Sequence, residues 1–199
     1  MAYVELHACS AFSFLRGASF PEQLAETAAG LQMPAMALLD RNGVYGAQRF
    51  SVAAREQNVR PIVGAELSME DGCILPVLVQ SRTGYKNLCE LLTQAHLRSE
   101  KGSCAVQWDE LTQYAEGLVV LLGSAREGVS APQRQNPTGR AQFLIDVFGR
   151  DHVFVEIQRH FVRGEDRINQ QLSDLAEHYR LALVAMTGRQ HCSARSQRR

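Results

Sequence analysis

The segment SFPEQLAETAAGLQMPAMALLD, from Ser19 to Asp40, predicts a helix followed directly by a buried strand. Ser19 with Glu22 three residues later is typical of a capping box at a helix start, and Gly30 is a common residue at a helix end. The apolar run AMALLD is typical of a buried strand that ends at Asp40. A helix joined to a buried strand in this way is the repeating unit of α/β folds.

The same alternation continues in both directions along the chain. On the N-terminal side YVEL predicts a strand, and MEDGCILPVLV predicts a strand reversal through Asp71-Gly72. The remaining helix and strand segments are GAQRFSVAAREQN, RPIVGAEL (a strand ending near Glu66), GYKNLCELLTQAHL, WDELTQYAEG, LVVLLG, RAQFLIDVFG, HVFVEIQ, EDRINQQLSDLAEHYR and LALVAM. Repeated β–α units predict a mainly parallel sheet, and the pattern leaves both an open doubly wound sheet and a closed barrel possible.

The composition is that of an ordinary globular protein. The chain has 199 residues, of which 45% are hydrophobic, and equal numbers (21 each) of basic and acidic residues. The zero formal charge gives no global sign of a nucleic-acid surface. Five cysteines without a C-x-x-C pair indicate free thiols in a reducing cytoplasm, and we expect no signal peptide or membrane span. SAREGVSAPQRQNPTGR, residues 124–140, is the most loop-like stretch.

Polar residues at strand ends are the candidates for chemistry, because ligands of β/α folds gather at the carboxyl edge of the strands. These candidates are His7 with Cys9, Asp40, Glu66, and Glu156 with His160. Histidine, carboxylate and thiolate groups bind zinc or manganese. Each also has a plainer interpretation: His7 as a hydrogen-bonded loop residue, Asp40 as a turn residue, and Cys9 as a small buried side chain.

Other site classes lack their motifs in this sequence. No G-x-G-x-x-G or Walker pattern follows a strand, and there is no G-x-S-x-G elbow of a serine hydrolase. The basic C-terminal stretch RQHCSARSQRR is typical of a solvated tail.

Seven segments, in order and at familiar spacing, resemble one known family: ELHACSAFSFLRGAS, MPAMALLDRNGVYGAQRF, RPIVGAEL, GYKNLCELLTQA, GLVVLLGS, VFVEIQRHF and LALVAMTG. Together they are similar to the N-terminal PHP (polymerase and histidinol phosphatase) domain of bacterial family C DNA polymerases, which are DNA polymerase III alpha-like. FSFLRGAS and VEIQRHF are most similar to the error-prone branch of that family.

The resemblance implies an α/β fold, a PHP-type distorted (β/α) barrel of mainly parallel strands. It further implies a PHP domain over residues 1–188 that is truncated at its C-terminal end, followed by a divergent basic tail at 189–199. In active PHP domains, histidines and carboxylates hold metal ions that activate water against a phosphoester. The resemblance also implies a cytoplasmic protein that works with polymerase core modules, DNA and other mutagenesis proteins; Mg would serve a polymerase core that this chain lacks.

The sequence departs from the active pattern at the metal ligands. Cys9 stands at the second histidine of the H-x-H opening, while Arg16 and Arg41 replace an aspartate and a histidine. Ile74 stands where a ligand histidine often begins the next strand. At about 4 Å, a cation beside each arginine would cost on the order of 4 kcal/mol at an effective dielectric near 20.

The remnant metal site therefore consists of His7, Cys9, Asp40 and Glu66. We expect no cofactor in this chain, with Arg16 and Arg41 forming ion pairs to Asp40 and Glu66 in place of the metals.

The resemblance to the PHP family, together with the departures at the metal ligands, leaves three functions to consider. The first is a structural and interaction domain of an error-prone DNA-directed DNA polymerase, a nucleotidyltransferase of DNA replication and damage-induced mutagenesis. The second is an active phosphoesterase or 3′–5′ exonuclease that uses Zn or Mn at the remnant site, since a single zinc needs only three or four ligands. The third is a histidinol-phosphate type phosphatase, which the polymerase-like segments disfavour.

Overall fold

The structure is a computed structural model that describes residues 3–100, 102–123, 137–159 and 163–186. It divides into two compact units, of which the first runs to Ala65 and the second from Glu66 to Met186. Within these described ranges, seven strands follow one another in the sheet in their sequence order, β1 to β7.

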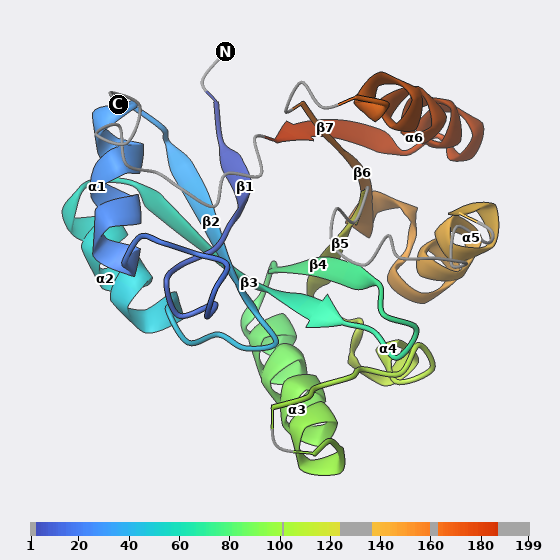
Figure 1. The fold of residues 1–199 in the computed structure, drawn as a ribbon, viewed down its shortest axis with the longest axis horizontal. Helices are drawn as coiled ribbons and strands as arrows, with labels where there is room; N and C mark the ends of the chain where they lie inside the picture. The colour runs from blue at the N-terminus through green and yellow to red at the C-terminus, as the bar shows by residue number, and fades with distance from the viewer. Residues whose placement is uncertain (1–2, 101, 124–136, 160–162, 187–199) are drawn as a thin grey trace. The chain divides into compact units, whose positions relative to one another are not determined.

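The first unit is a β–α–β–α arrangement followed by the beginning of a third strand. Its elements are β1 (Glu5–Ala8), α1 (Pro21–Gly30), β2 (Ala35–Arg41), α2 (Ala47–Glu56) and the first part of β3 (Arg60–Ser68). Strands β1 and β2 are parallel, and α1 and α2 lie side by side (Figure 1). Phe50 is the largest side chain of the core between these elements, and it is completely buried.

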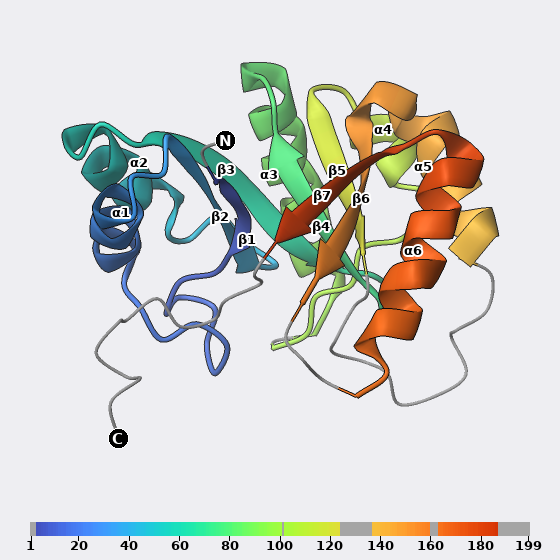
Figure 2. The same cartoon turned by 90° about the horizontal axis from the view of Figure 1, so that it is seen from above.

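The second unit contains the remaining strands and four α-helices among its described residues. Its elements are the end of β3, β4 (Ile74–Val79), α3 (Arg82–Arg98), α4 (Leu111–Tyr114), β5 (Leu118–Gly123), α5 (Pro137–Phe148), a 3-10 turn η1 (Arg150–His152), β6 (Val153–Gln158), α6 (Glu165–Tyr179) and β7 (Ala182–Met186). Helix α6 packs on β6 and β7 (Figure 2). Strand β5 is antiparallel to β4 and parallel to β6, which is parallel to β7.

The predicted α/β class with mainly parallel strands is confirmed. The reversal predicted at Asp71-Gly72 is also present, because Gly72 has φ +81° and its backbone N–H donates to the carbonyl of Met69 at 2.9 Å. Strand β5 covers the same residues as the predicted LVVLLG. Among the described residues, no helix combines the length and apolar character needed to cross a membrane.

The predicted cap of α1 is wrong by one residue. The helix starts after Phe20, whose backbone N–H donates to Oε1 of Gln23 at 2.9 Å. Ser19 is buried, and its carbonyl accepts a hydrogen bond from the backbone of Ala11, so the position before the helix is fixed by a loop contact. The predicted end of α1 at Gly30 is confirmed.

Three other boundaries also differ from the predictions. Strand β1 begins at Glu5, which places His7 inside it, and β3 continues to Ser68, which places Glu66 inside that strand. Helix α5 begins at Pro137, within the segment that was predicted as a loop. The rest of that segment, residues 124–136, and the predicted basic tail at 189–199 lie outside the described residues.

Candidate functional site

Asp40 near the end of β2 is the buried carboxylate around which the candidate site of the first unit is built. The residue is 1% exposed. Its Oδ1 accepts from the Ser10 backbone N–H at 2.9 Å, the Ser10 hydroxyl at 2.8 Å and the Ser13 hydroxyl at 2.7 Å. Its Oδ2 accepts from the Gly46 backbone N–H at 2.9 Å and from the Ser10 hydroxyl at 3.1 Å. The carboxylate thus joins the segment after β1 to the segment before α2.

Each of the two serine hydroxyls both donates and accepts a hydrogen bond. The Ser10 Oγ accepts a hydrogen bond from the Phe12 backbone N–H at 3.1 Å, and the Ser13 Oγ accepts one from the Arg41 backbone N–H at 3.0 Å. Each hydroxyl donates its one proton to Asp40 and accepts a backbone proton in return. Because every group has a partner, this buried polar network carries no desolvation penalty from an unpaired group.

Backbone contacts close the loop of residues 10–19 on itself. The N–H groups of Arg16 and Gly17 both donate to the Ser13 carbonyl, at 2.9 and 3.0 Å. A Cβ atom at Gly17 would lie 1.9 Å from the Ser10 carbonyl oxygen, so this close approach requires glycine. The loop therefore has one defined conformation anchored to Asp40.

Arg49 of α2 connects this loop to α1. Its guanidinium carbon lies 5.2 Å from the centre of the Phe12 ring and 5.8 Å from that of Phe20, and its Nε donates to Glu22. The hydrogen bond from Arg49 holds the pKa of Glu22 below its usual range. Beyond this contact the loop turns Phe14 outward, where it is 83% exposed.

The other predicted ligands lie at different places in the two units. His7 is half-buried in β1 and its backbone N–H donates to Oε1 of Glu5 at 3.0 Å, while Cys9 is buried just after the strand. Glu5, which the sequence did not single out, is 2% exposed and also accepts a hydrogen bond from the Tyr3 hydroxyl. Glu66 lies in the second unit, half-buried in β3.

The predicted arginine pairs remain a prediction. The hydrogen bonds to Asp40 come from Ser10, Ser13 and Gly46.

The strand-end candidate Glu156 is buried in β6, where it accepts a hydrogen bond from Nε2 of Gln158 at 2.6 Å. Its predicted neighbour, His160, lies outside the described residues.

Asp40 does not fit the role of a metal ligand in this structure. A carboxylate has about four lone-pair sites, and the two backbone N–H groups and two hydroxyl groups around Asp40 supply four protons to them. Within the described part of the chain, no group of three or more His, Cys, Asp or Glu side chains is arranged to hold a metal ion. Nor does any buried side-chain nitrogen or oxygen among these residues lack a hydrogen-bond partner.

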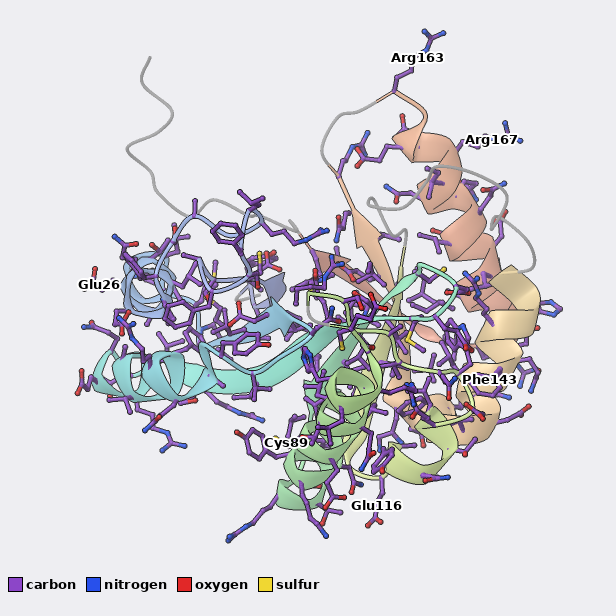
Figure 3. All side chains as sticks on the ribbon, turned by 60° about the horizontal axis from the view of Figure 1, so that its bottom comes forward. Glu26, Cys89, Glu116, Phe143, Arg163 and Arg167 are labelled. Atoms are coloured by element: carbon purple, nitrogen blue, oxygen red, sulfur yellow. The ribbon has the colours of Figure 1, made fainter. Side chains whose placement is uncertain are left out.

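A second polar cluster, in the second unit, fastens α5 to the turn between β3 and β4. Arg140 donates to Asp71 and to the sulfur of Cys73, and its guanidinium lies 5.5 Å from the centre of the Trp108 ring. The Trp108 ring packs edge-on against Phe143, which Figure 3 labels on α5. Burial raises the pKa of the Cys73 thiol, so this cysteine lacks the depressed pKa of a reactive thiol.

Comparison with known proteins gives the family. The PHP domain family matches residues 5–160. Error-prone DNA polymerases from Mycolicibacterium paratuberculosis and Mycobacterium bovis are each 40% identical to this chain, covering 99% and 94% of it. In both cases the chain spans only 19% of the relative's length, and the matching part is its N-terminal region.

Solved structures show the same fold at low sequence identity. A candidate metal-dependent phosphoesterase from Bifidobacterium adolescentis has a TM-score of 0.69 at 13% identity, with 94% of this chain and 87% of that one covered. An amidohydrolase from Chromobacterium violaceum has a TM-score of 0.64 at 12% identity, with the same coverage. These likenesses confirm the predicted PHP-type fold, and the family match over most of its length shows that the chain belongs to the PHP domain family.

Proposed function

We propose that this chain is the N-terminal PHP domain of an error-prone DNA-directed DNA polymerase, with a degenerate metal site and a structural and interaction role. The observation that carries the proposal is the 40% identity over 99% of this chain to the N-terminal region of such a polymerase. We keep residues 1–188 as the proposed extent of the domain, with 189–199 as a basic tail.

In this proposal the chemistry of nucleotidyl transfer belongs to modules outside the matched region. The domain would contact those polymerase modules and DNA, and other mutagenesis proteins, in the cytoplasm during damage-induced synthesis. Magnesium would be needed by the polymerase modules and not by this domain. The described residues offer a reason for the structural role: Asp40 fixes two loops by hydrogen bonds.

The first experiment tests the polymerase assignment. Antibodies against this chain would isolate the native product from its source cells, and mass spectrometry would give its size. A product roughly five times longer than 199 residues, the ratio implied by the 19% coverage, is expected. It should also extend a primer on a template that carries a lesion. A stable native product of 22.1 kDa without such activity would overturn the assignment.

The second experiment tests the alternative, an active phosphoesterase or exonuclease. The purified chain would be incubated with Zn or Mn and with bis(p-nitrophenyl) phosphate or single-stranded DNA. We expect hydrolysis at the rate of the buffer alone. Hydrolysis that disappears in His7→Ala would favour the remnant site of His7, Cys9, Asp40 and Glu66 over a structural role.

A further inference from the structure

We infer that Phe14 and Leu15, the tip of loop 10–19, dock into an apolar pocket on the polymerase modules that lie outside the matched region of the longer relatives. The inference names a contact surface for a partner that is already proposed, so it rests on the proposed function. It requires neither a metal nor a catalytic role for this domain.

The first step concerns the exposure of the tip. Phe14 is 83% exposed and Leu15 is 89% exposed, which makes them the two most exposed large apolar side chains among the described residues. Apolar side chains that are exposed singly are common on protein surfaces and need no explanation. Two such side chains that are adjacent in the chain and largely in water indicate a contact that this domain does not make by itself.

The second step concerns the backbone at the tip. Leu15 has φ +61°, a left-handed conformation that is unfavourable for leucine and easier for glycine or asparagine. The other non-glycine residues with positive φ in the described part of the chain are all polar: Gln32, Asn42, Asn58 and Arg180. Residues in such conformations cluster at sites of binding and switching. A leucine at this position therefore points to a use for its side chain.

The third step concerns how firmly the tip is held. On its C-terminal side, the N–H groups of Arg16 and Gly17 donate to the Ser13 carbonyl. On its N-terminal side, the Phe12 ring lies 5.2 Å from the guanidinium carbon of Arg49. Because both ends of the tip are fixed, little backbone freedom is lost when it docks, and a preorganised contact costs less to form than a flexible one.

The fourth step identifies the occupant from the area of the tip. A large side chain buries about 150–250 Å², so Phe14 and Leu15 together offer well under the roughly 800 Å² per partner that a stable interface between separate proteins buries. The tip would therefore hold a second copy or a free protein only weakly. A partner in the same chain needs less area, because its effective concentration is on the order of mM. The chain matches only 19% of the length of the error-prone polymerase relatives, so the rest of such a chain supplies this partner.

The experiment is hydroxyl-radical footprinting of the native product, read by mass spectrometry for each residue and scaled to the rate of the same residue in urea. We expect Phe14 and Leu15 to be labelled at least about 5-fold more slowly than Leu97, because docking excludes water. Leu97 is the matched reference, since it is 78% exposed but lies in the regular helix α3. Equal rates at the tip and at Leu97 would overturn the inference, as would protection that disappears on dilution, which would come from a second copy.

A variant tests whether the two side chains share one pocket. Leu15→Asn removes the apolar group and keeps a residue that tolerates positive φ, so the loop retains its shape. The labelling of Phe14 in the native product should then rise at least about 3-fold, whereas the control Leu97→Asn should leave it within about 2-fold of wild type. An unchanged rate at Phe14 in Leu15→Asn would overturn the shared pocket.

The size of the same product separates this inference from the function on which it rests. A native product of 22.1 kDa would overturn the polymerase assignment and the docking together. A long product that extends primers but leaves the tip unprotected would overturn the docking alone.

Discussion

Gly46→Ala should destabilise the first unit, because Gly46 lies against the Asp40 network with no room for a methyl group. A Cβ atom built there would lie 2.8 Å from Oδ2 of Asp40, 2.8 Å from a methyl carbon of Leu38 and 3.0 Å from Oγ of Ser10. None of the three is free to move, since Leu38 is 2% exposed and the other two are tied by hydrogen bonds.

Backbone strain does not contribute to this prediction. Gly46 has φ −85° and ψ −10°, a conformation that alanine adopts readily. Replacing such a glycine reduces the entropy of the unfolded chain and should by itself stabilise the fold by about 0.4–1 kcal/mol. Inserting a methyl group into a packed site costs about 1–3 kcal/mol. The middle of the steric range exceeds the middle of the entropic range, which leaves a net loss of about 1.3 kcal/mol and at most about 2.6 kcal/mol.

Gly30→Ala is the matched control. Gly30 is the last residue of α1, its φ is not positive, and a Cβ atom there would have no neighbour within 4 Å. Only the gain of about 0.4–1 kcal/mol applies to this substitution. The two glycines belong to the same unit and differ in their surroundings, so the two variants should shift stability in opposite directions.

Hydrogen exchange of the amides in α1 and α2 is the suitable assay, because these amides lie in the first unit itself, whereas the one tryptophan, Trp108, lies in the second. The free energy of opening should fall in Gly46→Ala and rise in Gly30→Ala. If Gly46→Ala were as stable as Gly30→Ala, the space beside Asp40 would be open, and the close packing of the network would be refuted.

The remaining predictions concern three other places in the chain. Ser81→Ala removes the bond from the Gly84 N–H that caps α3 and should cost about 1 kcal/mol, measured as a lower urea midpoint. Burial of Asp71 tends to raise its pKa, but the Cys73 N–H and the Arg140 charge outweigh burial and lower it. The ionised Asp71 side chain therefore stabilises the fold fully at pH values above the ordinary carboxyl pKa, and this stabilisation is lost as the pH falls through the pKa of Asp71 in the folded protein. Asp71→Asn should therefore make the urea midpoint depend less on pH in the acid range. Phe14→Ser, at an exposed position, should change stability by less than about 0.5 kcal/mol and reduce self-association in light scattering.

The elements could be predicted from the sequence because their signals are local. The run LVVLLG gives β5 without error, and the apolar run that ends at Asp40 gives β2 to within one residue. The start of α1 was predicted less accurately than these strands. A serine followed by glutamate three residues later caps a helix only if the serine is not held by other contacts. The Ser19 carbonyl instead accepts the backbone N–H of Ala11 in the loop, and the Gln23 side chain accepts the Phe20 N–H at the helix start.

The candidate metal site stays a prediction, although the structure shows the surroundings of one of its residues. The sequence singled out Asp40 because it is a carboxylate at the end of a buried strand, and the structure shows that its side chain is 1% exposed. Its serine partners were not singled out in the sequence. The partners Ser10 and Ser13 lie 30 and 27 residues away in the sequence, and a serine after a strand is common in any loop.

Neutral donors around Asp40 have a physical advantage over charged ones. A guanidinium brought next to a carboxylate that is 1% exposed would itself have to be desolvated, and the attraction between two buried charges often fails to offset that cost. A serine hydroxyl brings one donor with little volume and no net charge, and it can accept a backbone proton at the same time. A carboxylate can therefore stay buried with neutral donors alone, provided that the backbone supplies the remaining protons, as Ser10 and Gly46 do.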